Sequence, residues 1–166
     1  MRYGIRRISI EDFGAVAEIY NSNKDFLIHH LGISKVDPAF VEKEVQTMTD
    51  LGFLSCVIFD VRTFEICGLI DYKIGSEVYL SLLMLKKSFQ KKGIGQEVFS
   101  FWESELTGQE ISHIRIDVVH DHVDHSITFW EKMGFNKFEE IELAWGEKKN
   151  RAIVMKKYVG AKKRNM

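Results

Sequence analysis

The first group of residues whose types and spacing could do chemistry is the short segment Gln90–Gly95, with the sequence QKKGIG. The segment follows an apolar run and precedes apolar residues at helical spacing, so it is expected to open a helix. A helix N-terminus presents unpaired N–H groups and a partial positive charge, and glycine lets the backbone approach a ligand closely. Because Lys91 and Lys92 add full positive charge, this loop predicts a pyrophosphate-binding site.

Two other kinds of phosphate loop are excluded by the sequence. The pattern GxxxxGK followed by Ser or Thr does not occur. A dinucleotide fingerprint would need a third small residue where Val98 stands after Gly93 and Gly95. The loop therefore belongs to neither class, and its place between a buried strand and an amphipathic helix is what favours anion binding.

A second group of candidate residues follows a predicted strand, where His120, His122, Asp124 and His125 form the pattern HxHxDH. Imidazole and carboxylate groups at this spacing could bind zinc, which would activate a water molecule for hydrolysis. The pattern resembles the first metal motif of metallo-β-lactamase-type hydrolases, but those enzymes need further histidines downstream, and none follows His125. A zinc hydrolase is therefore the rival hypothesis, while a polar loop with Asp124 as helix N-cap is favoured.

The periodicity of apolar residues predicts an α/β domain, a mixed sheet flanked by helices, with the glycine loop at its centre. Strands are expected at Arg2–Ile8, Leu54–Phe59, Ile66–Ile74, Val78–Leu85, Ile114–Val119, Phe135–Leu143 and Arg151–Tyr158. Helices are expected after Ser9, after Asp37, from Ile94 to about Gly108 and from Ser126 to Gly134, with Asn21–Val36 irregular. The resulting order is β-α-α-β-β-β-α-β-α-β-β, with one strand–helix–strand crossover around the loop.

Length and composition fit a single domain. The chain has 166 residues, of which 45% are hydrophobic, and it contains no internal repeat, so residues 1–166 are expected to form one domain with a core over about 3–158 and a basic tail at 159–166. A net charge of −1 argues against nucleic acid or an anionic membrane as a partner. Two cysteines without a CxxC pair, and no apolar leader, favour a reduced, cytoplasmic protein.

The loop and a second segment, Ser126–Phe135 with the sequence SITFWEKMGF, together resemble the GNAT superfamily of N-acetyltransferases. In that family a Q/R-x-x-G-x-G/A loop after the fourth strand holds the pyrophosphate of acetyl-CoA, and an A-I-x-x-Y-E-K-x-G-F segment follows downstream. The order of elements agrees over about residues 3–158. The resemblance implies an enzyme that moves an acetyl group from acetyl-CoA to a primary amine by direct attack, without a metal, and it leaves a homodimer open.

The resemblance also implies which residues would form the site. Those expected at acetyl-CoA are Leu83, Met84 and Leu85 of the fourth strand, Gln90, Lys91, Lys92, Gly93, Ile94, Gly95 and Gln96 of the loop, and Ser126 and Trp130 beyond it. In the family, backbone N–H groups of the fourth strand stabilise charge on the thioester oxygen beside a bulge. The residues expected to line the acceptor site are Phe26, His29, His30 and Trp145.

A general base is needed because an alkylammonium, with a reference pKa of about 10, must lose a proton before it attacks. Some relatives place a glutamate eleven positions before the loop glutamine, where this chain has Tyr79. Strand alternation puts Glu77, Tyr79 and Ser81 on one face, so Glu77 and Tyr79 are the catalytic candidates. Asp71, Asp117 and a water relay are left open as alternatives.

Two positions depart from the family pattern. Trp130 stands where many relatives have the tyrosine that protonates the leaving thiolate, and Val123 stands where they often have an asparagine that bonds the pantetheine. Solvent could protonate a thiolate whose pKa is about 8.5, which leaves Trp130 a packing role. The departures keep open a CoA-binding module without catalysis, and neither the acceptor nor the length of the acyl group follows from the sequence.

Overall fold

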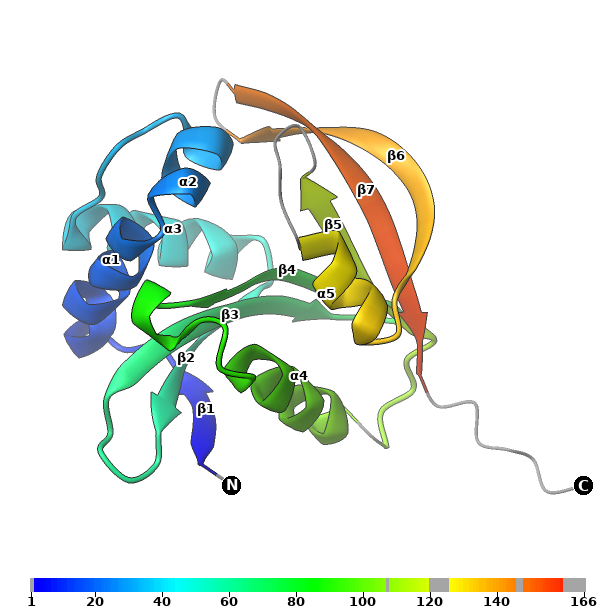
Figure 1. Ribbon diagram of the computed structural model, residues 1–166, viewed down its shortest axis with the longest axis horizontal. Helices are drawn as coiled ribbons and strands as arrows, with labels where there is room; N and C mark the ends of the chain where they lie inside the picture. Colours follow the sequence, from blue (N-terminus) through cyan, green and yellow to red (C-terminus); the bar gives the residue numbers. More distant parts are fainter. Residues whose placement is uncertain (1, 107, 120–125, 146–147, 160–166) are drawn as a thin grey trace, which may run out of the picture.

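The computed structural model describes residues 2–106, 108–119, 126–145 and 148–159. Within them, seven strands form one sheet in the order β1-β2-β3-β4-β5-β7-β6 (Figure 1). The strands are β1 (Tyr3–Arg7), β2 (Leu54–Asp60), β3 (Ile66–Ile74), β4 (Val78–Leu85), β5 (His113–Val119), β6 (Asn136–Trp145) and β7 (Lys148–Tyr158). The helical elements are η1 (Ile10–Asp12), α1 (Phe13–Ser22), α2 (Lys24–Phe26), η2 (Leu27–Leu31), α3 (Pro38–Asp50), η3 (Lys87–Phe89), α4 (Ile94–Glu105) and α5 (Ser126–Lys132).

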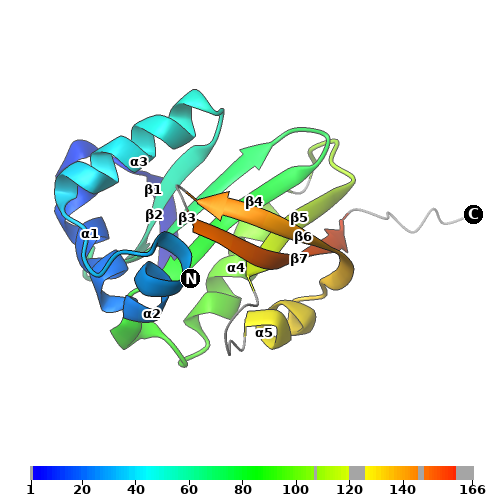
Figure 2. The ribbon, with the colours of Figure 1, turned by 90° about the horizontal axis from the view of Figure 1, so that it is seen from above.

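Helices cover both faces of the sheet, which gives two core layers (Figure 2). On one face, α1 and α3 pack onto β2 and β3, and their cluster includes Ile19 and Val41. On the other face, α4 and α5 pack onto the sheet around Phe99 and Trp102. Each of these four helices therefore packs one apolar face against the sheet, as its periodic sequence predicts.

The pairing between β4 and β5 is short, and it decides the shape of the middle of the sheet. The other neighbouring strands pair antiparallel, whereas β4 and β5 are parallel and pair only at Val78↔Ile114 and Tyr79↔Arg115. Beyond these pairs the two strands diverge, with β5 running toward the β6–β7 hairpin (Figure 1). We call Ser81–Leu85, the last five residues of the part of β4 that lacks β5 as a neighbour, the splay edge.

A bulge lies where the splay edge begins. Against β3, Leu80 pairs with Tyr72 and Leu82 pairs with Asp71, so Ser81 has no partner in the register. An extra residue of this kind bends its strand and increases the local twist. The bulge thus helps to turn the end of β4 away from β5.

The side chains of β4 change face across the bulge. Before it, Val78 and Leu80 pack in the cluster beneath α4, and after it Leu83 and Leu85 do so. Strict alternation would have placed only even-numbered residues there. The single face expected for alternate residues of this strand therefore ends at Ser81, which corrects the sequence-based expectation.

The expected element order and the mixed sheet are confirmed, and β3 and β4 have the predicted bounds. Asp37 caps α3 by accepting a hydrogen bond from the N–H of Phe40 at 2.9 Å. The expectation that residues 21–36 are irregular is wrong, because α2 and η2 lie there. These turns of three and five residues are too short to show helical periodicity.

In the described ranges, no helix is long and apolar enough to cross a membrane.

Gly68 is the tightest point of the sheet beside the splay edge, and it yields a stability prediction. A Cβ added there would lie 2.6 Å from the carbonyl oxygen of Met84 and 2.9 Å from a methyl of Leu85. We expect Gly68→Ala to lower the free energy of unfolding by about 2 to 3 kcal/mol, measured by urea denaturation. Gly14→Ala is the control, because a Cβ on α1 there meets nothing within 4 Å and should add up to about 1 kcal/mol. Equal stability of Gly68→Ala and the parent chain would contradict this packing.

Candidate active site

The loop between β4 and α4 has the backbone of an anion site. Lys91 and Gly93 adopt left-handed conformations with φ of 60° and 78°, and Gly93 is the N-cap of α4. Left-handed residues turn successive N–H groups into a concave cluster, here at a helix end with partial positive charge. A Cβ added to Gly93 would meet nothing within 4 Å, and the side chains of Lys91 and Lys92 are exposed. The loop therefore has both the space and the charge to hold a pyrophosphate.

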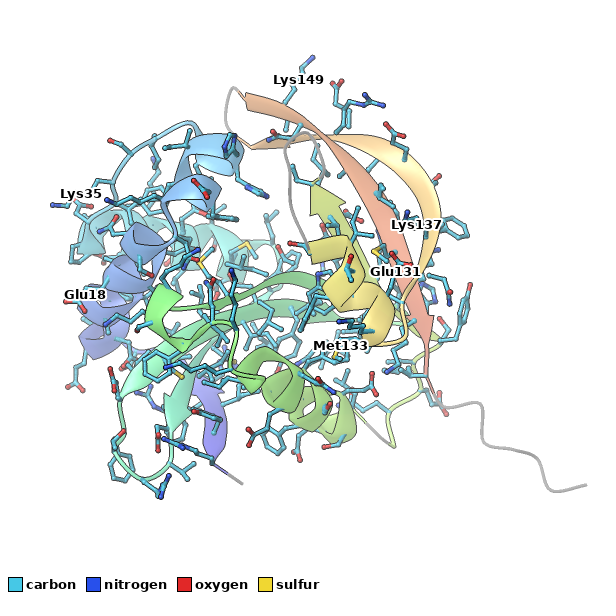
Figure 3. The ribbon with its side chains drawn as sticks, viewed as in Figure 1. Glu18, Lys35, Glu131, Met133, Lys137 and Lys149 are labelled. Atoms are coloured by element: carbon cyan, nitrogen blue, oxygen red, sulfur yellow. The ribbon has the colours of Figure 1, made fainter. Side chains whose placement is uncertain are left out.

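Gly95, in contrast, is a packing position. A Cβ there would lie 3.6 Å from the ring of Phe129, an ordinary packing distance, so this position faces α5. Trp130 on α5 and Met133, which directly follows α5, pack against the core cluster that includes residues of α4. Figure 3 labels Met133. The ring of Trp130 lies edge-on to Phe99, with centroids 5.6 Å apart. These contacts fix α5 against the helix that begins at the loop.

Gln90, the first residue of the loop motif, uses its side chain to bind the protein itself. Its Nε2 donates to the carbonyl oxygen of Leu85 at 2.8 Å and to Oδ1 of Asn23 at 2.7 Å. The amide thus holds the loop against the end of β4 and the end of α1. Gln96 is the third residue of α4 and is exposed, while Ile94 is buried.

The three residues of β4 that were expected to donate N–H groups to the thioester oxygen differ in the direction of those groups. The N–H of Lys86 donates to the carbonyl of Cys67 on β3 at 2.7 Å. Because these groups alternate along a strand, the N–H of Met84 also faces β3. The N–H groups of Leu83 and Leu85 consequently face away from β3, along the splay edge. Leu83 and Leu85 are therefore the two residues of the three whose N–H groups point where β5 is missing.

The carboxylate of Glu77 is paired at the closed end of the β4–β5 pairing. Its Oε1 lies 3.2 Å from Nε2 of His113, and Nδ1 of that ring lies 2.7 Å from Oγ of Ser112. Glu77 immediately precedes β4, whose eight residues span about 25 Å, and the loop follows the other end. Glu77 therefore lies at the end of the strand opposite to the glycine loop.

Tyr79 bridges β4 and β5 at the point where they part. Its hydroxyl donates to Oδ2 of Asp117 at 2.8 Å, and Oδ1 of the same carboxylate accepts from Nε of Arg115 at 2.9 Å. Burial, followed by the charge of Asp117, raises the pKa of Tyr79. The phenol is therefore neutral at physiological pH, and its proton is directed at the Asp117 carboxylate.

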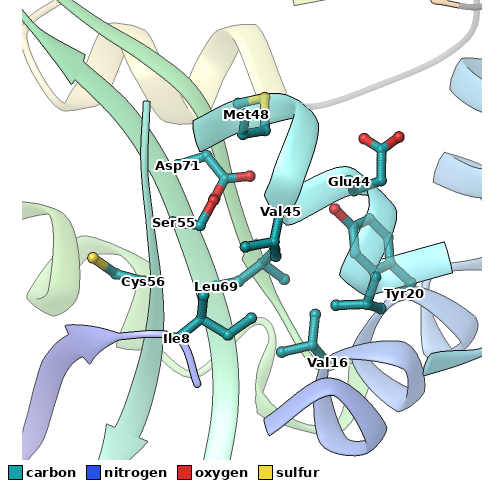
Figure 4. Close-up of a pocket in the computed structure, with 11 residues that line it drawn as sticks. Ile8, Val16, Tyr20, Glu44, Val45, Met48, Ser55, Cys56, Leu69 and Asp71 are labelled. Carbon is teal, nitrogen blue, oxygen red and sulfur yellow. The ribbon is translucent and has the colours of Figure 1, made fainter. Parts of the chain in front are cut away.

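Asp71 occupies a separate, small cavity between the sheet and helices α1 and α3 (Figure 4). The cavity has a volume of about 10 Å³, at the lower limit for one water molecule. The carboxyl is only 7% exposed and lies beside Ser55, with Tyr20 and Glu44 across the cavity. Burial raises the pKa of Asp71 to about 6, although the Ser55 hydroxyl opposes the shift.

Two of the predicted acceptor-site residues lie together on the α2–η2 segment. The rings of Phe26 and His30 stack with centroids 4.4 Å apart, and Phe26 lies 6.1 Å from the ring of Tyr20. His29 is half-buried on the same turn, which contacts β7. Trp145 ends β6, and its side chain lies outside the described part of the chain.

The structure does not test the zinc hypothesis. His120, His122, Asp124 and His125 all lie outside the described residues, as does Val123. Among the residues that the structure does describe, no group of three or more His, Cys, Asp and Glu side chains could hold a metal ion.

Three residues at the site were missed by sequence reasoning. Asn23 lies between two helical segments, and an asparagine in such a place carries no signal of a tertiary contact. Arg115 and His113 alternate with apolar residues along β5, so their common face was visible in the sequence. Their partners, Tyr79 with Asp117 and Glu77, depend on which strands are neighbours.

Comparisons with known proteins identify the family and agree with the fold. A family model described as "Acetyltransferase (GNAT) domain" matches residues 29–157, while no curated protein matches the chain. The fold is similar to that of spermidine N-acetyltransferase from Vibrio cholerae in complex with CoA and spermine, with a TM-score of 0.74, 13% identity and 95% of each chain covered. Ribosomal-protein-S5-alanine acetyltransferase from Vibrio fischeri gives a TM-score of 0.72 at 18% identity, covering 97% of this chain and 95% of that one. A phosphinothricin acetyltransferase from Sinorhizobium meliloti in complex with AcCoA gives 0.68 at 16% identity, covering 95% and 89%.

The buried carboxyl of Asp71 predicts a pH-dependent stability. Its folded-state pKa is raised from 3.8 to about 6, so its contribution is fully present below pH 4 and is lost as pH rises through about 6. At about 1.4 kcal/mol per pKa unit, roughly 3 kcal/mol is lost. We expect Asp71→Asn, which cannot ionise, to gain about 2 to 3 kcal/mol over the parent chain between pH 4 and pH 7.5, measured by urea denaturation at each pH. Asp50→Asn, at an exposed carboxylate, is the control, and parallel pH profiles of Asp71→Asn and the parent chain would contradict the shift.

Proposed function

This chain belongs to the GNAT acetyltransferases, and from that premise we propose that it transfers an acetyl group from acetyl-CoA to a primary amine. The observation that carries the proposal is the position of the glycine loop at the end of the splay edge of β4. A ligand with an anionic end and an amide-rich arm would meet N–H groups of the helix start first and those of the strand next. Acetyl-CoA, when bound, would supply the acyl group as a thioester.

The loop residues would hold the pyrophosphate. Gly93 leaves space beside the first N–H groups of α4, and Lys91 and Lys92 bring positive charge without burial. Helix-end N–H groups are fixed by the helix, so little order has to be gained on binding. Ser126 and Trp130 of α5 are proposed to flank the same ligand, with Trp130 acting through packing.

The splay edge would stabilise charge on the thioester oxygen. Leu83 and Leu85 turn their N–H groups away from β3, and the sheet fixes their direction before any ligand arrives. Donors that are already oriented at the place where charge develops need no reorganisation during the reaction. We assign this role to Leu83 and Leu85, with Met84 supporting them through its bond to β3.

Tyr79 and Asp117 are the groups that we propose for handling the amine proton. The hydroxyl oxygen of Tyr79 retains acceptor capacity while its proton points to Asp117. As the amine nitrogen bonds to the acyl carbon and the carbon–sulfur bond breaks, the amine proton passes to Tyr79 and the phenol proton passes to Asp117 and then to solvent. The departing thiolate, with a pKa of about 8.5, needs no protein acid near neutral pH.

Tyr79 is favoured over Glu77 as the catalytic residue. It lies two residues nearer to the splay edge, and its hydroxyl leans across to β5. Glu77 instead pairs with His113 at the far end of β4, where it would support the β4–β5 pairing. The α2–η2 segment, with Phe26, His29 and His30, is proposed to wall the acceptor site together with Trp145.

Binding of CoA is the first prediction of this proposal. We expect calorimetry to give a dissociation constant in the micromolar range for the parent chain and a loss of at least about tenfold for Gly93→Glu, because a carboxylate would enter the phosphate cradle. Gly108→Glu is a matched control, since Gly108 also has positive φ (91°) and open space around it but follows the other end of α4. No heat of binding with millimolar CoA, or equal loss in the two variants, would refute the assigned loop.

Catalysis is the second prediction. With acetyl-CoA and a panel of small amines, thiol release should reveal turnover, and Tyr79→Phe should lower kcat about a hundredfold with an unchanged affinity for CoA. Tyr158→Phe, at a tyrosine that is 69% exposed, should keep the parent kcat. Retention of the parent kcat by Tyr79→Phe would remove Tyr79 from the mechanism, and silence across a broad panel would favour a CoA-binding module without catalysis.

A further inference from the structure

Two cationic side chains lie directly opposite each other on β5 and β7. Arg115 and Lys156 are partners in the register of these strands. Their neighbours Ile116 and Met155 pack in the core on the side of α4. Arg115 and Lys156 therefore share the other face of the sheet, which is the face that carries Tyr79. Like charges directly opposite each other in a sheet are destabilising, so this pair costs stability.

The carboxylate of Asp117 neutralises only one of these two charges. It accepts from Nε of Arg115 at 2.9 Å and from Nη2 at 3.3 Å. Nζ of Lys156 lies 3.9 Å from the ring centroid of Phe138, and no carboxylate of the described residues pairs with it. The other acid nearby, Glu77, is paired with His113. One positive charge therefore remains beside Arg115.

The guanidinium of Arg115 has an open end. A guanidinium carries five N–H donors in a planar fork, and Asp117 occupies those on one side, at Nε and Nη2. The part of the chain that the structure describes provides no acceptor for Nη1. The side chain of Arg115 is 31% exposed, whereas that of Asp117 is 4% exposed. An accessible guanidinium end of this kind fits a carboxylate through two parallel hydrogen bonds.

Lys73 shows how a cation on this face can instead serve the fold. It lies on β3 in register with Tyr79. Its Nζ donates to the carbonyl oxygen of Leu51 at 2.9 Å and lies 5.8 Å from the ring centroid of Phe53. Among the described residues, Nζ of Lys156 has no comparable hydrogen bond. The opposed pair on β5 and β7 is therefore available to a ligand in a way that Lys73 is not.

The open end of Arg115 lies beside the groups that we propose for handling the amine proton. The Tyr79 hydroxyl and Nη2 of Arg115 both contact Oδ2 of Asp117, at 2.8 and 3.3 Å, so they are at most about 6 Å apart. The guanidinium carbon also lies 5.6 Å from the ring centroid of Tyr79. The amine and the carboxylate of a small amino acid are about 3 to 5 Å apart. An amine at the Tyr79 hydroxyl could therefore place its carboxylate at Arg115.

We propose that Arg115 and Lys156 bind a carboxylate of the acceptor, and that the acceptor is consequently a small amino acid. The inference rests on the proposed transfer of an acetyl group to a primary amine. The carboxylate would accept two hydrogen bonds from the open end of Arg115, and Nζ of Lys156 would turn to it from the ring of Phe138. An anion between two opposed cations replaces their repulsion with attraction, which gives the pair on β5 and β7 a function.

Initial rates with acetyl-CoA and a panel of α-, β- and γ-amino acids, each measured beside its primary amide, test the acceptor class. The amide keeps the size of the acceptor and removes its negative charge. For the preferred pair we expect kcat/KM to be at least about tenfold higher for the acid than for the amide. The panel also contains alkylamines and peptides with a free N-terminus, which lack a carboxylate close to the amine.

Lys156→Gln removes one of the two charges without touching Tyr79 or Asp117. We expect the ratio of kcat/KM between acid and amide to fall about fivefold, through a higher KM for the acid. Arg115→Lys, which keeps the charge but loses the planar fork, should lower this ratio further. Lys137→Gln is the matched control, because Lys137 is exposed on β6 and in register with Met155, on the other face of the sheet. It should keep the parent ratio.

The Nε–H resonance of Arg115 gives a readout that does not depend on turnover. In the labelled chain saturated with CoA, we expect the preferred amino acid to shift this resonance and its amide to leave it unchanged. Acetylation of amides, alkylamines or peptides as efficiently as amino acids would overturn the inference and leave acetyl transfer intact. Equal ratios in Lys156→Gln and Lys137→Gln would do the same. Silence across the whole panel would overturn the proposed function and the inference with it.

Discussion

The rest of this structure depends on one loss of pairing: β4 and β5 are hydrogen-bonded only at their first residues and then part. A strand edge in the middle of a sheet carries N–H and carbonyl groups that need partners. The chain fills one of them with side chains, at the Leu85 carbonyl. The N–H groups of Leu83 and Leu85 face the same side, and an amide-containing ligand is the partner that fits their direction. The glycine loop at the end of this edge adds the positive charge.

The two faces of the sheet carry different groups beside the splay edge. The face under α4 and α5 carries the loop and an aromatic cluster around Trp130 and Phe99, which would border the proposed anionic ligand. The opposite face carries Tyr79 and Asp117, joined across the strands, together with the α2–η2 segment. A donor that enters from one face would therefore present its reacting end to an acceptor on the other. The side-chain amides of Asn23 and Gln90, which both donate to the Leu85 carbonyl, lie at the end of β4.

Much of the fold could be predicted because apolar periodicity and turn residues report local structure directly. The bounds of β3 and β4, the cap at Asp37 and the helix after Gly93 all follow from such signals. The family resemblance implied a bulge on the fourth strand, but its position at Ser81 could not be predicted, since it is defined only by the register against β3. The same limit applies to the Tyr79–Asp117 bond, which joins residues 38 positions apart, and to the high pKa of Asp71, which is a product of burial. Motifs predicted the proposed anion site, whereas the proposed proton-handling groups required knowledge of which strands are neighbours.

The central claim is that the splay edge of β4 is where the acyl donor lies, and amide NMR of the labelled chain during a titration with acetyl-CoA tests it most directly. The account predicts that the N–H resonances of Leu83 and Leu85 shift strongly, together with those at the start of α4. The N–H of Met84, which points to β3, should shift far less. Shifts confined to the glycine loop, or equal shifts at all three positions of β4, would contradict the account.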